Sequence, residues 1–261
     1  MSVRPRPPVW LWFNLLSLDA PLIALIWQDF LSRCYPTVLH PTGRAVLGLT
    51  VWAIYLADRL LDVRHPALTG ESTRHQFYRT HRAFALTLLA AVLCADLFLV
   101  RYSLRPAVLG NGLVVTAGVV VYLGIFPLTR WGDRNWKKPL AALLFTAGTF
   151  LIAWTGAGQP LSQLIWPAAA FCALCLGNLL MIGRWSQSPD YSVSRGWIWL
   201  ALLAACLAVT RGSSWFTAIV YSAAGLCALA SWGRKISGDV RCILADAVLL
   251  TPLLFSMKLF R

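Results

Sequence analysis

The chain has 261 residues, of which 58% are apolar and only 13% are charged. A soluble domain carries about a quarter of its residues charged, so the composition excludes an ordinary soluble protein and predicts one that crosses a lipid bilayer several times. The net charge is +13, and the basic residues lie almost wholly in the short gaps between apolar runs. This position indicates that they set the membrane topology and contact anionic ligands, rather than form a surface that binds nucleic acid.

The apolar runs predict the helices. A helix that spans a bilayer needs roughly 20 mostly apolar residues. The runs that approach this length cover residues 10–31, 44–61, 82–100, 107–129, 139–158, 163–183, 196–210, 214–232 and 242–257. The gaps are short except for 63–81, and no soluble domain or repeat interrupts the runs. We therefore predict an all-α bundle of about nine transmembrane helices, with residues 1–261 forming one integral membrane domain.

The distribution of Lys and Arg predicts the orientation of this bundle. With the N-terminus inside, roughly twice as many basic residues fall in inside loops as in outside loops. The first run follows Arg4 and Arg6 as in a signal peptide, but Asp19 and Pro21 interrupt it, which favours a retained first helix. We expect a cytoplasmic N-terminus, an outside C-terminus and a location in the bacterial inner membrane.

The stretch IYLADRLLD, residues 54–62, places two aspartates at the cytoplasmic end of the second predicted helix. Asp58 and Asp62 are four residues apart and share one helical face, about 6 Å apart along the axis. Two such carboxylates repel each other unless a cation lies between them. Mg²⁺ usually binds one or two carboxylates together with substrate phosphates, so the spacing indicates a magnesium diphosphate site. Ion pairs with Arg59 and Arg64, which would complete the helix end, are the alternative.

From its central aspartate onward, the same stretch resembles the first aspartate-rich motif of the UbiA superfamily of intramembrane aromatic prenyltransferases. Ile54 and Tyr55 stand where that motif begins with Asn-Asp. FPLTRW at 126–131 resembles the YPxxKR of the family and puts Arg130 where a phosphate-contacting lysine is expected. Asn14 lies near the depth of a family asparagine that helps to hold the diphosphate. The resemblance implies nine helices with the N-terminus inside.

The second aspartate-rich motif of the family would fall after the sixth helix, in LCLGNLLMIGRWSQSPDYSVSRG. That stretch departs from the pattern, because only Asn178 and Asp190 remain as oxygen ligands, with Arg184 between them. By resemblance, a member uses both motifs to hold magnesium around the diphosphate.

The resemblance implies a Mg²⁺-dependent enzyme that transfers an isoprenyl group from an isoprenyl diphosphate to a lipophilic acceptor within the membrane. Asp58 and Asp62 would be the catalytic pair and would bind the metal together with Asp190. The diphosphate would be bound by Asn14, Arg130, Lys137, Lys138, Asn178 and Arg184. Two alternatives stay open, namely an intramembrane terpene cyclase and a non-catalytic lipid-binding protein or carrier built on the same bundle.

Asp19, Asp96 and Asp246 lie inside apolar runs, where an ionisable group usually faces the bundle interior. Asp19 and Asp246 each precede a proline, so a cavity role and a local helix kink are both open for them. Asp96 is expected to pair with Arg101 or Arg105. No Walker A, GxGxxG, HExxH or GxSxG motif occurs, so nucleotide hydrolysis, dinucleotide redox chemistry and serine hydrolysis have no support.

Overall fold

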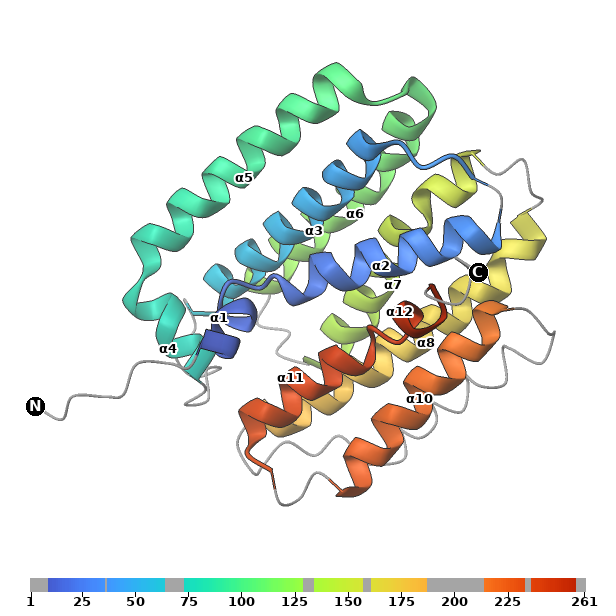
Figure 1. Cartoon of the computed structure of the whole chain (residues 1–261). Helices are drawn as coiled ribbons and strands as arrows, with labels where there is room; N and C mark the ends of the chain where they lie inside the picture. Colours follow the sequence, from blue (N-terminus) through green and yellow to red (C-terminus); the bar gives the residue numbers. More distant parts are fainter. Residues whose placement is uncertain are drawn as a thin grey trace, which may run out of the picture.

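The computed structural model describes residues 9–35, 37–63, 73–128, 134–156, 161–186, 214–232 and 236–256. Every regular element in these ranges is a helix (Figure 1). The helices are α1 (Val9–Leu15), α2 (Asp19–Cys34), α3 (Pro41–Asp62), α4 (Thr73–Thr80), α5 (Arg82–Ser103), α6 (Pro106–Leu128), α7 (Arg134–Gly156), α8 (Leu161–Ser186), α10 (Ser214–Trp232), α11 (Gly238–Val248) and α12 (Pro252–Ser256). The all-α prediction is confirmed for this part of the chain.

The long helices coincide with the predicted runs, but two runs are divided. The first run forms α1 and α2, and the last forms α11 and α12. The run 196–210 lies outside the described residues. Within the described ranges, 4 helices are long and apolar enough to cross a membrane, and they belong to α5, α6, α7 and α8. This is consistent with a membrane protein, while the number of nine spanning helices stays a prediction.

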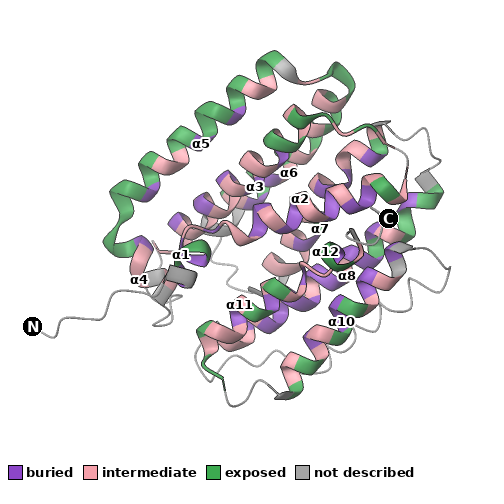
Figure 2. Ribbon diagram, viewed as in Figure 1, coloured by how far each residue is buried: buried purple, intermediate pink, exposed green. Residues whose placement is uncertain are grey.

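The core of the bundle is aromatic. Trp27 of α2 lies 4.8 Å from Phe171 of α8 and 5.0 Å from Trp215 of α10, measured between ring centroids. Phe30 stacks on Trp215 at 5.6 Å, and Phe150 of α7 packs edge-on against the same ring. All five rings are almost completely buried, and buried positions run along the facing sides of α2, α8, α10 and α11 (Figure 2). These rings fix how the central helices pack together.

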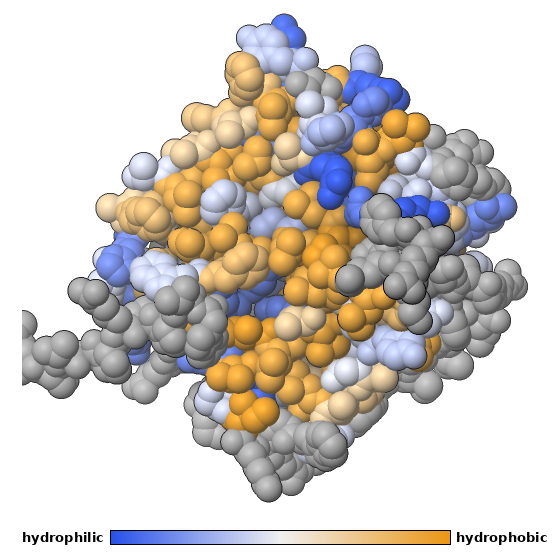
Figure 3. Space-filling view, viewed as in Figure 1, coloured by the Kyte–Doolittle hydropathy of each residue, from blue (hydrophilic) through white to orange (hydrophobic). Residues whose placement is uncertain are grey.

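Two helices present apolar side chains outward. On α5, Leu97 and Phe98 are 65% and 62% exposed, and on α6, Val114 is 73% exposed. Figure 2 shows α5 as largely exposed along its length, and Figure 3 shows apolar residues over much of one face of the molecule. A water-soluble monomer rarely exposes so much contiguous apolar surface. The surface therefore suits contact with lipid chains.

The break between α1 and α2 is a specific backbone structure. Ser17 has a φ of 54°, in the left-handed region that few residues other than glycine adopt. Its hydroxyl bonds the hydroxyl of Tyr78 in α4 at 3.1 Å. The indole N–H of Trp52 in α3 donates to the carbonyl oxygen of Leu16 at 2.8 Å. Side chains from two other helices thus stabilise the interrupted backbone just before Asp19.

A second break separates α11 from α12, shortly after Asp246. The indole N–H of Trp27 donates to the carbonyl oxygen of Leu249 at 2.7 Å, and the hydroxyl groups of Ser222 and Thr251 contact each other. Irregular backbone at membrane depth is tolerated where it is buried in protein or lines a cavity. Asp19 and Asp246 therefore both adjoin helix breaks, which agrees with the predicted kinks.

The contact between α10 and α11 depends on a small residue, and this generates a prediction. A Cβ added at Gly225 would lie 2.8 Å from Cγ1 of Val248, so Gly225→Ala should force the two helices apart. We expect a cost of about 1–3 kcal/mol, seen as a lower Tm of the detergent-solubilised protein. The control is Gly124→Ala in α6, where a Cβ would meet nothing within 4 Å. A Gly225→Ala protein as stable as this control would contradict the packing.

Candidate functional site

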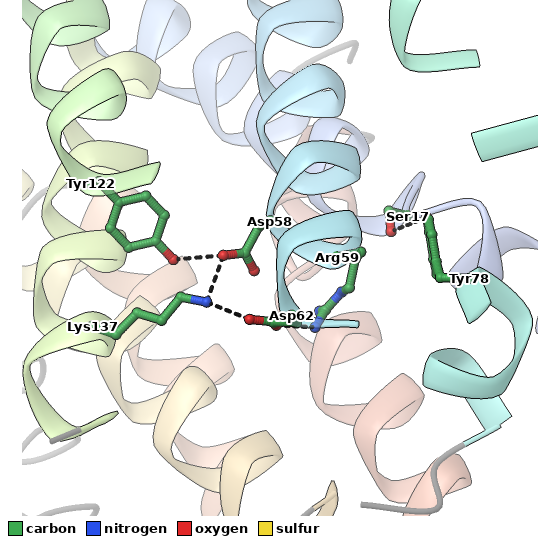
Figure 4. A network of polar contacts seen from close by, with 7 residues as sticks. All are labelled: Ser17, Asp58, Arg59, Asp62, Tyr78, Tyr122 and Lys137. Carbon is green, nitrogen blue, oxygen red and sulfur yellow. Dashed lines mark hydrogen bonds and ion pairs between the residues drawn. The ribbon is translucent and has the colours of Figure 1, made fainter. Parts of the chain in front are cut away.

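The two aspartates of IYLADRLLD converge on a single positive charge. The Nζ of Lys137, in the first turn of α7, lies 2.7 Å from Oδ1 of Asp58 and 2.8 Å from Oδ1 of Asp62. Figure 4 shows the lysine extending from α7 toward α3 and ending between the two carboxylates. The spacing of four residues puts both carboxylates on one face of α3. The cation expected between them is therefore supplied by the protein itself.

Tyr122 of α6 completes this cluster. Its hydroxyl donates to Oδ1 of Asp58 at 3.1 Å, and the ammonium group of Lys137 lies 5.8 Å from the centre of its ring. Tyr122 was not among the site residues predicted from the sequence. The sequence feature that could have indicated it is a single tyrosine in the otherwise apolar stretch VVVYLG, residues 119–124.

Arg59 adds a second positive charge beside the pair. Its guanidinium Nη1 lies 4.0 Å from Oδ2 of Asp62, at the edge of ion-pairing distance. Its Nε is buried and has no hydrogen-bond partner among the described residues. The alternative prediction was that Arg59 and Arg64 form ion pairs with the two aspartates. Arg59 forms a long ion pair with Asp62, and Arg64 lies outside the described residues. The main partner is Lys137, which that alternative did not name.

A second polar cluster includes the aspartates beside the two helix breaks. The amide of Asn14 donates to Oδ2 of Asp19 at 2.8 Å, and the amide of Asn178 in α8 donates to Oδ1 of Asp246 at 3.0 Å. The carboxyl groups of Asp19 and Asp246 lie within hydrogen-bonding reach of each other. Asn14 and Asn178 are only 5% and 4% exposed, so both face the bundle interior rather than lipid.

The helix α3 connects the two clusters. Tyr55 interacts electrostatically with both Asp19 and Asp246, and Arg59 interacts with Asp19 as well as with its own neighbours on α3. Tyr55 precedes Asp58 by three residues and therefore lies almost one turn away on the same helix. Residues of α3 thus lie near both polar clusters.

The remaining predicted site residues have different positions. Lys138 and Arg184 are half-buried near the ends of α7 and α8, and both make interactions there. Arg130 and Asp190 lie outside the described residues. Asp96 accepts a hydrogen bond from the hydroxyl of Thr50 at 2.8 Å, and Arg105 contacts His40. The expected pairing of Asp96 with an arginine is therefore replaced by a hydrogen bond between α5 and α3.

The fit of this site to Mg²⁺ depends on Lys137. Within the described ranges, no group of three or more His, Cys, Asp or Glu side chains could hold a metal ion. The oxygens of Asp58 and Asp62 are nevertheless hard ligands that converge on one point, and substrate phosphates usually complete such a magnesium site. The ammonium group of Lys137 occupies that point, so metal binding requires the lysine to move away.

Comparison of the chain with protein-family models, with curated proteins and with solved structures finds no match. The likeness to the UbiA superfamily therefore rests on the sequence patterns described above.

The lysine bridge generates a prediction about stability. Lys137→Met should leave Asp58 and Asp62 facing each other without their shared cation and so destabilise the protein. We expect a loss of about 1–3 kcal/mol, because the three groups are only partly buried, with a lower Tm in EDTA. Added Mg²⁺ should then raise the Tm of Lys137→Met more than that of the wild type.

Lys138→Met is the matched control for this substitution, since it removes the adjacent positive charge of the same helix. An unchanged Tm for Lys137→Met in EDTA would show that the bridge contributes nothing to stability.

Proposed function

We propose that the protein is a Mg²⁺-dependent membrane enzyme that transfers an isoprenyl group from an isoprenyl diphosphate to a lipophilic acceptor. One observation carries this proposal. Two carboxylates of α3 converge on the ammonium group of Lys137, with Arg59 beside them. A site with adjacent carboxylates and neighbouring positive charges suits a metal-bound diphosphate. The resemblance of IYLADRLLD to the first UbiA motif supports the same substrate class.

The chain's own residues would bind the two parts of this ligand. Asp58 and Asp62 would hold Mg²⁺, which supplies positive charge to the leaving diphosphate when bound. Lys137 has three N–H donors on a flexible stem, so it can exchange its carboxylate partners for phosphate oxygens. Tyr122 keeps its hydrogen bond to Asp58 and so holds that carboxylate in place during the exchange.

The proposed reaction starts at the allylic carbon–oxygen bond. This bond breaks with both electrons going to the diphosphate oxygen, and Lys137 and Arg59 stabilise the charge that develops there. The allylic cation is captured by the acceptor, which forms the new bond and releases a proton. The aromatic and aliphatic side chains of the bundle exclude water, which would otherwise quench the cation.

The finer membrane arrangement is part of the proposal. We place the N-terminus in the cytoplasm, the protein in a bacterial inner membrane, and the Asp58–Lys137 cluster at the cytoplasmic ends of nine spanning helices. Single cysteines introduced at positions 70 and 135 should then react with a membrane-impermeant maleimide only from the cytoplasmic side. Labelling of the two positions from opposite sides would contradict the arrangement.

A non-catalytic lipid-binding protein or carrier is the second candidate, and one observation favours it. Lys137 and Tyr122 already satisfy the facing oxygens of Asp58 and Asp62 without any ligand. A cluster of this kind can hold α3, α6 and α7 together as a purely structural contact.

An activity assay separates these functions. Purified protein would be incubated with prenyl diphosphates of several chain lengths, with and without Mg²⁺ and with and without aromatic acceptors, and pyrophosphate release would be measured. We expect release only with Mg²⁺, and a loss of about 100-fold or more in Asp58→Asn and Asp62→Asn, because an amide lacks the charge that a hard cation requires. Asp29→Asn is the control, since Asp29 pairs with Arg33 within α2.

The products distinguish the remaining alternatives. Release that needs an acceptor supports transfer, whereas release with a new hydrocarbon and no acceptor supports cyclisation. No release with any diphosphate, with or without Mg²⁺, would contradict the enzyme and favour the carrier.

A further inference from the structure

We propose that Gln28 of α2 binds a hydroxyl group of the lipophilic acceptor. Gln28 is buried in the bundle and belongs to neither of the two polar clusters described above. The inference rests on the proposed function in one respect, namely that the protein takes a lipophilic acceptor. It names a substrate class, which is an acceptor with a hydroxyl group remote from the carbon that forms the new bond.

The amide of Gln28 is a buried polar group without a partner. The residue is 2% exposed, and neither its Nε2 nor its Oε1 has a hydrogen-bond partner among the described residues. Buried polar atoms are normally paired, and an unpaired amide in apolar surroundings is costly. Both the donor and the acceptor of this side chain are therefore available to a ligand.

The surroundings of Gln28 are apolar and include small residues. Ala24 of α2 packs with Leu47 and Val51 of α3 in one buried cluster. Gln28 follows Ala24 by four residues and therefore lies on the same face of α2. On α7, a Cβ added at Gly148 would meet only Leu47 within 4 Å, at 3.8 Å. The space of a side chain at Gly148 is thus free for part of a lipophilic molecule.

The level of Gln28 in the bundle shows which substrate can reach it. The helices α2 and α3 lie side by side (Figure 1), and Asp29, next to Gln28, pairs with Arg44 of α3 at 3.6 Å. Gln28 is therefore near the start of α3, whereas Asp58 is near its end, about 20 Å away along the helix axis. A diphosphate bound at Asp58 does not extend to Gln28.

The other parts of the substrates narrow the choice. An isoprenyl chain carries no polar atom, so it cannot pair with the amide. The acceptor has its reacting carbon against the allylic carbon near the Asp58–Lys137 cluster, and its far end can extend toward Gln28. The missing hydrogen bonds are therefore assigned to a polar group at the far end of the acceptor.

The two unpaired atoms indicate which polar group this is. A hydroxyl group donates one hydrogen bond and also accepts, so a single hydroxyl can pair with both Oε1 and Nε2 of Gln28. A quinone carbonyl only accepts and would leave Oε1 without a donor. An ammonium group only donates and would leave Nε2 without an acceptor.

The test compares 2-naphthol with naphthalene, which lacks the hydroxyl group, in equilibrium dialysis against the purified full chain in detergent. We expect the wild type to bind 2-naphthol about 10-fold more tightly and Gln28→Met to lose this preference, because methionine keeps the length of the side chain without its polar atoms. Gln163→Met in α8 is the matched control and should keep the preference, since Gln163 is exposed.

Stability gives a second readout, which a purely structural role of Gln28 would move in the opposite direction. An apolar side chain of similar shape removes the cost of an unpaired buried amide. Gln28→Met and Gln28→Leu should therefore each raise the Tm of the ligand-free protein, whereas Gln163→Met should leave it unchanged.

Three results would overturn the assignment of Gln28. They are a wild type without preference for 2-naphthol, an unchanged preference in Gln28→Met, and a lower Tm for both ligand-free Gln28 variants. Failure of the proposed function is a separate result, because it appears as absent pyrophosphate release in the wild type, whatever the preference for 2-naphthol.

Discussion

The shared ion pair of Lys137 with Asp58 and Asp62 is the interaction on which the polar end of the bundle depends. It joins α7 to α3, and the hydrogen bond from Tyr122 adds α6 to the same cluster. Without the lysine, two carboxylates of one helical face would repel each other in surroundings with little water. The bridge therefore stabilises the protein without a ligand. A metal-bound diphosphate would have to displace Lys137 from these two carboxylates.

The rest of the architecture keeps this polar interior apart from lipid. Aromatic rings of α2, α7, α8 and α10 fill the core, while α5 and α6 present apolar side chains outward. Two interrupted helices bring Asp19 and Asp246 inward, and Tyr55 and Arg59 of α3 connect them electrostatically to the lysine bridge. Carboxylates, amides and cations gathered between the helices of a membrane protein are costly. Hydrogen bonds from Asn14 and Asn178 and the ion pairs of Lys137 offset this cost in the structure.

The sequence predicted the features that depend on local pattern. Long apolar runs predicted α3, α5, α6, α7, α8 and α10, because a spanning helix requires only a sufficiently long, mostly apolar segment. The repulsion between Asp58 and Asp62 predicted a cation between them. It did not predict that Lys137 supplies this cation, because residues 58 and 137 come together only through helix packing. Kinks were expected near Asp19 and Asp246, but the breaks were not placed at Ser17 and Leu249, because hydropathy averages over a few residues and the stabilising indoles come from distant parts of the chain. The roles assigned to Arg130 and Asp190 lie outside the described residues and stay predictions.

The central claim is that Lys137 occupies the position of a metal ion and gives it up when substrate binds. An experimental structure with Mg²⁺ and a non-reactive prenyl thiodiphosphate tests this most directly. The claim predicts metal density between Asp58 and Asp62, with the ammonium group of Lys137 moved from the carboxylates to a phosphate oxygen. Lys137 still 2.7 Å from Asp58 and 2.8 Å from Asp62, with no metal between them at saturating ligand, would contradict it.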